Sequence, residues 1–144
     1  MNILVSACLL GVECRYNGGG CLNDGVMGLS AEHLLLPVCP EQLGGLPTPR
    51  EPSERLGDKV VSSTGRDVTA QFERGAQETV KIAEMFHCSC AVMKSKSPSC
   101  GCGMIYDGSF SGSLIPGNGT AAQKLLESGI HVYSEDRIDE LKMR

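Results

Sequence analysis

Short apolar runs along this chain predict buried β-strands, and stretches of helical character separate them. The runs cover residues 3–7, 34–38, 90–93 and 130–133. Runs of this length, followed by turn-forming or polar residues, are typical of buried strands. Because helical stretches lie between them, successive strands are expected to be parallel and joined by crossovers. The pattern therefore predicts an α/β fold with a mostly parallel, Rossmann-like sheet flanked by helices.

Helical periodicity is clearest in the middle of the chain. Apolar residues recur at helical spacing over residues 72–83 and predict the longest helix. A shorter helix is predicted over residues 26–33. Thr120, followed three residues later by Gln123, has the pattern of a capping box, which predicts a helix that ends at Gly129.

Turn residues predict two β-hairpins beside the main sheet. Residues 60–68 surround a Thr-Gly turn, and residues 104–111 surround an Asp-Gly turn, which is the stronger hairpin signal. Residues 40–52 hold four of the seven prolines together with two adjacent glycines. We expect this segment to be a loop or a lid, without helix or strand.

Composition indicates one globular domain over residues 1–144, because 41% of the residues are hydrophobic and 21% are charged. The net charge of −4 and the lack of like-charge runs disfavour direct nucleic-acid binding, so we expect a small-molecule partner. With no basic leader and no membrane-spanning apolar stretch, we expect a cytoplasmic protein without a membrane partner. The oligomeric state stays open.

Eight cysteines are scattered along the chain, and none of them forms a Cys-x-x-Cys pair. That spacing disfavours a zinc ribbon or a thioredoxin-type redox pair. In a reducing compartment, cysteines serve as ligands, as catalytic thiols or as buried hydrophobic residues rather than as disulfides. The sequence also lacks a P-loop and a Gly-x-Gly-x-x-Gly fingerprint.

Three of the cysteines, Cys8, Cys39 and Cys100, follow shortly after predicted strands. The carboxyl ends of parallel strands share one edge of the sheet, and ligands bind there. Three soft thiolates at one place suggest a metal or iron–sulfur site. Cys88 and Cys90 stand at the beginning of a strand instead, and we interpret them as buried hydrophobic residues.

Specific motifs surround these three cysteines: Ser-Ala-Cys-Leu-Leu-Gly with Cys-Arg-Tyr, Pro-Val-Cys-Pro-Glu, and Ser-Pro-Ser-Cys-Gly. Together they resemble the thiouracil desulfidase family, long known only as a bacterial domain of unknown function, over nearly the whole chain. The resemblance implies a [4Fe-4S] cluster held by three cysteines, here Cys8, Cys39 and Cys100. It also implies that the fourth iron has no protein ligand and that a thione sulfur is removed without net redox change.

The same resemblance implies acid–base or proton-relay roles for Glu41 and Ser97, with Ser99 as a neighbour. Glu41 stands two residues after an implied ligand, where a carboxylate can deprotonate water. Its other interpretation is a surface carboxylate paired with an arginine. The serines can relay a proton or stabilise charge, and otherwise they cap a helix or a turn.

Several cations stand in or beside the motifs. Three thiolates around a cluster leave a net negative site, so Arg15, Arg50 and Lys96 are expected to offset charge or to position the substrate. Each is otherwise a solvated surface cation. Cys14 and Cys102 are the competing ligands, because they lie close to the implied ligands in sequence.

The leading hypothesis is a cluster-dependent, non-redox desulfidase that acts on a thiolated pyrimidine base or nucleoside, with water as co-reactant. An open iron is a Lewis acid that can bind a soft thione sulfur and polarise the C=S bond. Two alternatives remain open. One is a zinc- or cluster-binding module for storage or sensing, and the other is an enzyme with Cys100 as a thiolate nucleophile.

Overall fold

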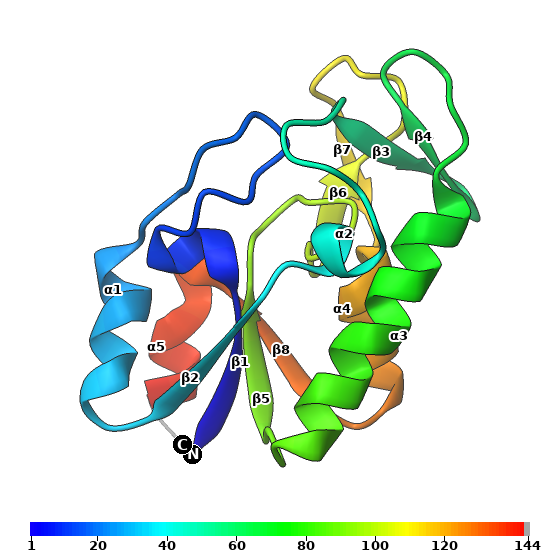
Figure 1. Ribbon diagram of the computed structural model, residues 1–144. Coiled ribbons are helices and arrows are strands. Elements are labelled where there is room, and N and C mark those ends of the chain that lie inside the picture. The colour runs from blue at the N-terminus through cyan, green and yellow to red at the C-terminus, as the bar shows by residue number, and fades with distance from the viewer. Residues whose placement is uncertain (143–144) are drawn as a thin grey trace.

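The computed structural model describes residues 1–142, which form a mixed α/β domain (Figure 1). The main sheet has four parallel strands in the order β2-β1-β5-β8. Their ends lie within one residue of the predicted ends, so the predicted sheet is confirmed. The strands are β1 (Asn2–Ser6), β2 (Leu34–Val38), β5 (Cys90–Met93) and β8 (His131–Ser134).

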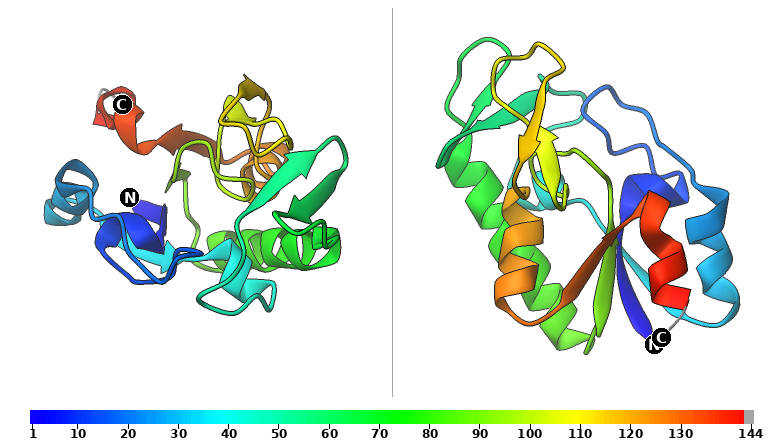
Figure 2. Two further views of the ribbon diagram at one scale, coloured as in Figure 1. Left: turned by 90° about the horizontal axis from the view of Figure 1, so that it is seen from above. Right: turned by 180° about the vertical axis from the view of Figure 1, so that it is seen from behind.

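Helices cover both faces of this sheet, which gives three layers (Figure 2). Helices α1 and α5 lie on one face, and α3 and α4 pack against each other on the opposite face. Three 3₁₀ turns complete the helical part. The bounds are α1 (Asp24–Met27), α3 (Thr69–Met85), α4 (Thr120–Glu127), α5 (Ile138–Lys142), η1 (Ala7–Leu10), η2 (Gly28–Ala31) and η3 (Glu135–Arg137).

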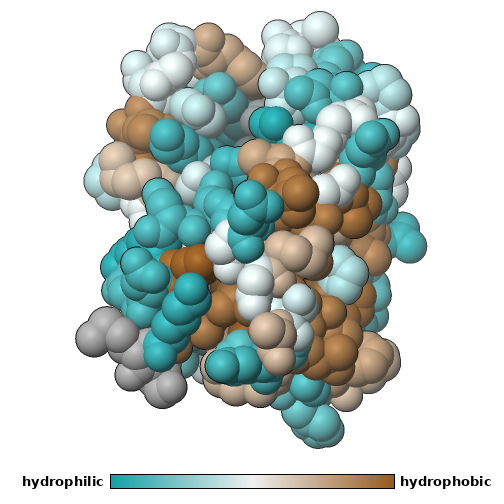
Figure 3. Space-filling view, turned by 90° about the vertical axis from the view of Figure 1, so that its left-hand side faces the viewer, coloured by the Kyte–Doolittle hydropathy of each residue, from teal (hydrophilic) through white to brown (hydrophobic). Residues whose placement is uncertain are grey.

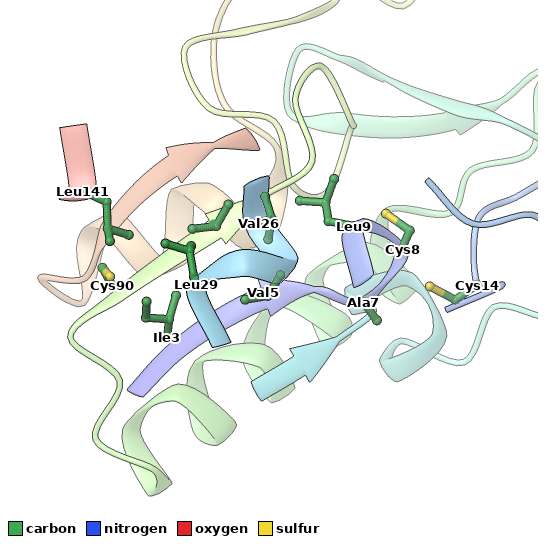
Figure 4. Close-up of a cluster of buried hydrophobic side chains, with 11 residues drawn as sticks. Ile3, Val5, Ala7, Cys8, Leu9, Cys14, Val26, Leu29, Cys90 and Leu141 are labelled. Carbon is green, nitrogen blue, oxygen red and sulfur yellow. The ribbon is translucent and has the colours of Figure 1, made fainter. Parts of the chain in front are cut away.

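The alternation of side chains along β1 divides the core in two. Ile3 and Val5 pack with α1 and α5, whereas Leu4 packs with α3 and α4, and all three side chains are fully buried. Figure 4 shows the first of these clusters. A continuously apolar strand is thus explained by layers of helix on both sides.

Two antiparallel hairpins stand beside the sheet, but their pairing differs from the prediction. Strand β3 (Ser53–Leu56) pairs with β4 (Lys59–Ser62), and β6 (Met104–Tyr106) pairs with β7 (Leu114–Pro116). The predicted hairpin over residues 60–68 is present only as a short turn. One antiparallel bridge joins Val61 to Asp67, flanked by hydrogen bonds from Ser62 N to Arg66 O and from Val68 N to Val60 O, and the main partner of β4 is β3. In the second hairpin the partner strand begins beyond the predicted residues 109–111.

The proline-rich segment also differs from the prediction, because it contains helix α2 (Pro40–Leu43). Proline is favourable at the first helical position, where its missing N–H needs no partner. The predicted capping box was wrong as well. Gly119 is the N-cap of α4, and the Thr120 hydroxyl is buried without a partner. The start of α4 is held instead by the backbone: Thr120 N donates to Pro98 O at 2.9 Å and Ala121 N to Ser99 O at 2.8 Å.

Strand β2 forms one edge of the sheet. Pro37 in this strand has no N–H to offer to another strand, which protects the edge from further pairing. Hydrophobic side chains gather over the lower half of the side on which α1 and β2 lie (Figure 3), and Met27 and Leu34 are exposed in these elements. Within residues 1–142, no helix combines the length and apolar character that a membrane crossing demands.

The order of the strands positions the functional end of the molecule. From β1 the chain runs outward to β2 and then returns across β1 to β5. Such a switch point leaves a crevice beyond the carboxyl ends of β1 and β5, where α/β proteins bind ligands. Loops and both hairpins gather beyond that end of the sheet (Figure 1).

Candidate active site

A cavity of about 480 Å³ opens at the carboxyl ends of β1, β2 and β5. This volume is in the range of sites for small molecules. All nine residues predicted for the site line this one cavity, although they come from segments far apart in sequence. They are Cys8, Arg15, Cys39, Glu41, Arg50, Lys96, Ser97, Ser99 and Cys100.

The three predicted ligands stand beyond three neighbouring strands. Cys8 lies in η1 directly after β1, Cys39 separates β2 from α2, and Cys100 lies in the turn after β5. Figure 4 shows Cys8 at one end of the buried cluster, and Cys90 lies at the opposite end. Neither Cys88 nor Cys90 lines the cavity, which agrees with their interpretation as core residues.

Burial raises the pKa of two of the proposed ligands, Cys8 and Cys100. It raises the pKa of Cys8 to about 12, and the neighbouring Cys100 and Cys14 thiols add to the effect. The pKa of Cys100 rises to about 11 through burial, although hydrogen bonds to Ser6 and Ser99 act in the opposite direction. Thiols in this state become thiolates readily only beside a positive centre.

Of the two competing cysteines, Cys14 lies in the cavity and Cys102 does not. Cys14 is almost fully buried, and Figure 4 shows it beside Cys8. The Cys39 thiol donates a hydrogen bond to the carbonyl oxygen of Cys14 at 3.7 Å. Cys102 instead donates to Val132 O at 3.8 Å, on the sheet.

The donor set fits an iron–sulfur cluster. All the cysteines are free thiols, and four of them, Cys8, Cys14, Cys39 and Cys100, line one cavity. No three His, Cys, Asp or Glu side chains among residues 1–142 are grouped tightly enough to surround a single metal ion. A [4Fe-4S] cluster has a different requirement, because each thiolate binds a different iron and the ligands stand around the cluster.

Glu41, on α2, is held in place by Arg50. The Arg50 Nε donates to Glu41 Oε1 at 2.9 Å, and both side chains are largely buried. The same guanidinium donates to Cys14 O at 3.0 Å and to Thr48 Oγ1 at 3.0 Å. Arg50 therefore ties the proline-rich segment to the loop that carries Cys14. Glu41 is thus paired with an arginine, as in its alternative interpretation from the sequence, but the pair lies inside the cavity rather than on the surface.

A serine turn connects Glu41 to Cys100. Ser99 Oγ donates to Glu41 Oε2 at 2.9 Å and lies 3.5 Å from Cys100 Sγ. Ser97 Oγ lies 3.0 Å from Ser99 Oγ and accepts hydrogen bonds from the backbone N–H groups of Ser99 and Cys100. The order of the contacts is thus Ser97, Ser99, Glu41, with Ser99 in direct contact with the carboxylate.

The remaining cations differ in how they are held. Lys94 pairs with Glu135 at 3.0 Å, and Glu135 also accepts hydrogen bonds from the N–H and the hydroxyl of Ser95. Arg15 lies 5.9 Å from the centre of the Tyr16 ring. Lys96 is exposed at the cavity and has a left-handed backbone, with a φ of 66°. Lys94 is therefore structural, whereas Arg15 and Lys96 keep their charges at the cavity.

Among the cavity residues that were missed from the sequence are Ser6, Glu54 and Tyr106. Ser6 Oγ accepts a hydrogen bond from Lys94 N at 3.0 Å and so anchors the turn after β5. A polar residue within an otherwise apolar strand was the signal for it. Glu54 and Tyr106 belong to the hairpins whose pairing was predicted wrongly or only in part, so nothing in the pattern placed them at the cavity.

Comparisons with known proteins give consistent matches. Residues 3–137 match the model of the 2-thiouracil desulfurase family. The Bacillus subtilis (strain 168) protein YbbK, described as uncharacterized, is 41% identical over 149 aligned positions, which take in 96% of this chain and 99% of that protein. A solved structure described as the [4Fe-4S]-dependent thiouracil desulfidase TudS is 44% identical, with a TM-score of 0.93, over 99% of this chain and 95% of that one.

Proposed function

Because the chain belongs to the 2-thiouracil desulfurase family, we propose that it removes sulfur from a thiolated pyrimidine of the thiouracil type, without net redox change. The substrate is a free base or a nucleoside, and water is the second reactant. One observation carries this proposal: the three proposed ligands, the paired carboxylate of Glu41, and Ser97 and Ser99 all line one cavity of small-molecule size.

We assign the cluster ligands to Cys8, Cys39 and Cys100, with one iron left without a protein ligand. A [4Fe-4S] cluster bound in this way supplies a Lewis acid for the thione sulfur, which leaves the attached carbon open to attack by water. The cationic groups of Arg15 and Lys96 offset the negative charge of the site. Cys14 lies close enough to compete as a ligand, so its variant is part of the test below.

Glu41 and the serines handle the protons of the reaction. Glu41 Oε2 accepts a proton from the attacking water, because its other oxygen is held by Arg50. Ser99 Oγ is hydrogen-bonded to the same Oε2 atom, and Ser97 continues the chain of hydroxyls. A carbon–oxygen bond forms and the carbon–sulfur bond breaks, so sulfur leaves as hydrosulfide and no electron acceptor is needed.

Two features weigh against the alternatives. The pKa of Cys100, raised to about 11 by burial, disfavours a metal-free thiolate nucleophile at neutral pH. A storage or sensing module has no need for a carboxylate joined to a serine beside its ligands, whereas Glu41 and Ser99 are hydrogen-bonded at 2.9 Å.

The test is anaerobic reconstitution followed by incubation with 2-thiouracil. We expect about four irons and four sulfides per chain, together with release of uracil and hydrosulfide in equal amounts. Replacing Cys8, Cys39 or Cys100 by Ser should abolish cluster binding, whereas Cys14→Ala and Cys90→Ala should retain it. Zinc alone, or a full cluster without sulfide release, would contradict the proposed activity.

A further inference from the structure

Glu54 on β3 is a buried charged residue, with 9% of its surface exposed. It forms no ion pair with any described residue. Taking a carboxylate out of water is costly unless hydrogen bonds or opposite charges replace the lost solvation. The position of this side chain therefore calls for an explanation.

Only one of its two oxygens is occupied by the protein. Glu54 Oε1 accepts hydrogen bonds from Gly108 N at 3.0 Å and Phe110 N at 3.1 Å, both in the loop between β6 and β7. Gly108 lies so close to β3 that an added Cβ would come within 2.8 Å of Arg55 O. The loop and the carboxylate thus hold each other in place. Oε2 accepts no hydrogen bond from a described residue. It is also not one of the side-chain atoms that are sealed from solvent without a partner, so a ligand can reach it.

Glu54 lines the cavity that holds the cysteines, on the side formed by the hairpins. Two of the three tyrosines of the chain, Tyr16 and Tyr106, line the same cavity. Aromatic rings offer flat apolar faces on which a planar heterocycle can stack. An acceptor oxygen beside such faces suits a flat ring that carries a hydrogen-bond donor on its edge.

We propose that Glu54 Oε2 accepts a hydrogen bond from a ring N–H of the substrate and so selects thiopyrimidines whose ring nitrogen beside the C=S group is unsubstituted. This inference rests on the proposed function. A 2-thiopyrimidine has a ring nitrogen on each side of the C=S carbon, and an ionised carboxylate can only accept hydrogen bonds. A site built for such a donor rejects analogues that lack it, because the bound analogue shuts water away from the acceptor and leaves it unpaired.

Glu54→Gln tests the assignment with little disturbance of the loop. The amide oxygen can still accept from Gly108 N and Phe110 N, which turns the NH₂ group toward the position of Oε2 and replaces an acceptor by a donor. We expect the dissociation constant of 2-thiouracil, measured by equilibrium dialysis in a Glu41→Gln background that slows consumption of the ligand, to rise roughly ten- to hundredfold. KM should rise in parallel while kcat changes little, as for an interaction formed equally in ground and transition states.

The matched control is Glu32→Gln, which removes the same charge at an exposed position between η2 and β2. It should bind 2-thiouracil as the unaltered protein does. Iron content and thermal unfolding of both variants report whether the cluster and the fold are intact.

A second arm changes the substrate instead of the protein, so it holds even if Glu54→Gln fails to fold. Methylation of the ring nitrogen that faces Glu54 should weaken binding to the unaltered protein, and methylation of the other nitrogen should weaken it less. In Glu54→Gln the penalty for methylation should shrink, which a double-mutant cycle measures. Equal binding of 2-thiouracil by intact Glu54→Gln would overturn the assignment.

A comparison of free bases with nucleosides shows whether Glu54 binds a ring N–H or a ribose hydroxyl, which is also a hydrogen-bond donor. An effect of Glu54→Gln confined to 2-thiouridine, with 2-thiouracil unaffected, would overturn the ring assignment in favour of the sugar. Sulfide release tests the proposed function separately. If the unaltered protein binds 2-thiouracil, Glu54→Gln weakens that binding and no sulfide is released, the proposed activity is wrong but the Glu54 contact is supported. If the unaltered protein releases sulfide and Glu54→Gln changes neither binding nor KM, the activity is supported and the Glu54 contact is wrong.

Discussion

At the scale of single residues, two contacts orient the Glu41 carboxylate, which we propose as the general base. Arg50 fixes one oxygen of Glu41, and Ser99 donates to the other. A carboxylate held on both sides has a defined direction, and proton transfer requires such a defined geometry. The adjacent thiols of Cys39 and Cys100 place this carboxylate beside the proposed cluster.

Glu41→Gln should lower the rate of sulfide release by roughly 10²- to 10⁴-fold, the usual contribution of a general base. The amide can still accept from Arg50, so iron content should not change. Glu51→Gln is the matched control, because Glu51 lies exposed on the same segment and hydrogen-bonds Thr64. Unaltered turnover in Glu41→Gln would remove this residue from the mechanism.

Replacing Ser99 and replacing Ser97 should have different effects, because the two hydroxyls bind different groups. Ser99→Ala loses the hydrogen bond to the Glu41 carboxylate, so turnover should fall roughly ten- to hundredfold with iron retained. Ser97→Ala loses the acceptor for the N–H groups of Ser99 and Cys100, so the turn should loosen and iron should be lost as well. Iron and sulfide measured on the same samples decide this, and full iron retention in Ser97→Ala would contradict the anchoring role.

At the scale of elements, two glycines set how closely α2 packs on α3. A Cβ at Gly75 on α3 would lie 1.9 Å from Pro40 O, and a Cβ at Gly44 would lie 1.9 Å from Gln71 O. Backbone therefore meets backbone at this crossing. Because α2 carries Glu41 and follows Cys39 directly, the crossing also positions two site residues.

Gly75→Ala should destabilise the protein, although alanine is the better helix former by about 1 kcal/mol. The clash with the Pro40 carbonyl must push α2 outward, and such overpacking costs typically about 1–3 kcal/mol. Denaturant unfolding should show the loss, and iron content should fall with it. Gly28→Ala is the control, with a φ of −60° and no atom within 4 Å of the added Cβ; a stable, fully loaded Gly75→Ala would show that the crossing is not tight.

The elements also show what sequence patterns can predict. The four main strands were predicted well because a strand buried on both faces must be apolar along its whole length, which gives a continuous apolar run in the sequence. The hairpins were predicted less well. Strand β4 pairs with Ser53–Leu56, and that strand is partially exposed and has no apolar run by which the sequence could reveal it. The α2 turn was missed because prolines suggest a loop, although proline suits the first turn of a helix.

The residues of the candidate site also differ in how well the sequence predicted their positions. Cys8, Cys39 and Glu41 were predictable because they follow strands directly, and their motifs resemble a known family. The direct contact of Ser99 with Glu41 was not predictable, since hydroxyl positions depend on the turn that holds them. Glu54 was missed for a different reason: its role depends on a loop that comes back from residues more than fifty positions away.

At the scale of the whole molecule, the raised thiol pKa values connect stability to pH. In metal-free protein, burial raises the pKa of Cys8 to about 12 and that of Cys100 to about 11, from the ordinary value of 9.0. From about pH 9 up to these raised pKa values, the folded chain keeps protons that the unfolded chain releases. Stability from these groups is therefore full below pH 9 and is lost as pH rises.

Metal-free protein should lose about 1.4 kcal/mol of unfolding free energy per pH unit for each such thiol above pH 9. Denaturant unfolding at pH 8 and pH 10, with chelator and reductant present, measures the slope. Cys8→Ala should show a shallower slope than the unaltered protein, and Ser30→Ala, which removes an exposed hydroxyl and no thiol, serves as the control. Identical slopes for all three proteins would show that the Cys8 thiol ionises equally in both states.

The docking of α4 on the turn that carries Cys100 has a consequence for how the protein is made. Thr120 and Ala121 hold the backbone of Pro98 and Ser99, so residues synthesised later keep the third cysteine in position. During translation Cys8 and Cys39 leave the ribosome long before the third partner can be fixed. The proposed cluster needs all three cysteines, so we expect it to be loaded into the finished polypeptide rather than into a nascent one. Cells that make this protein faster than they supply iron and sulfide should accumulate a folded, empty form that can be loaded afterwards.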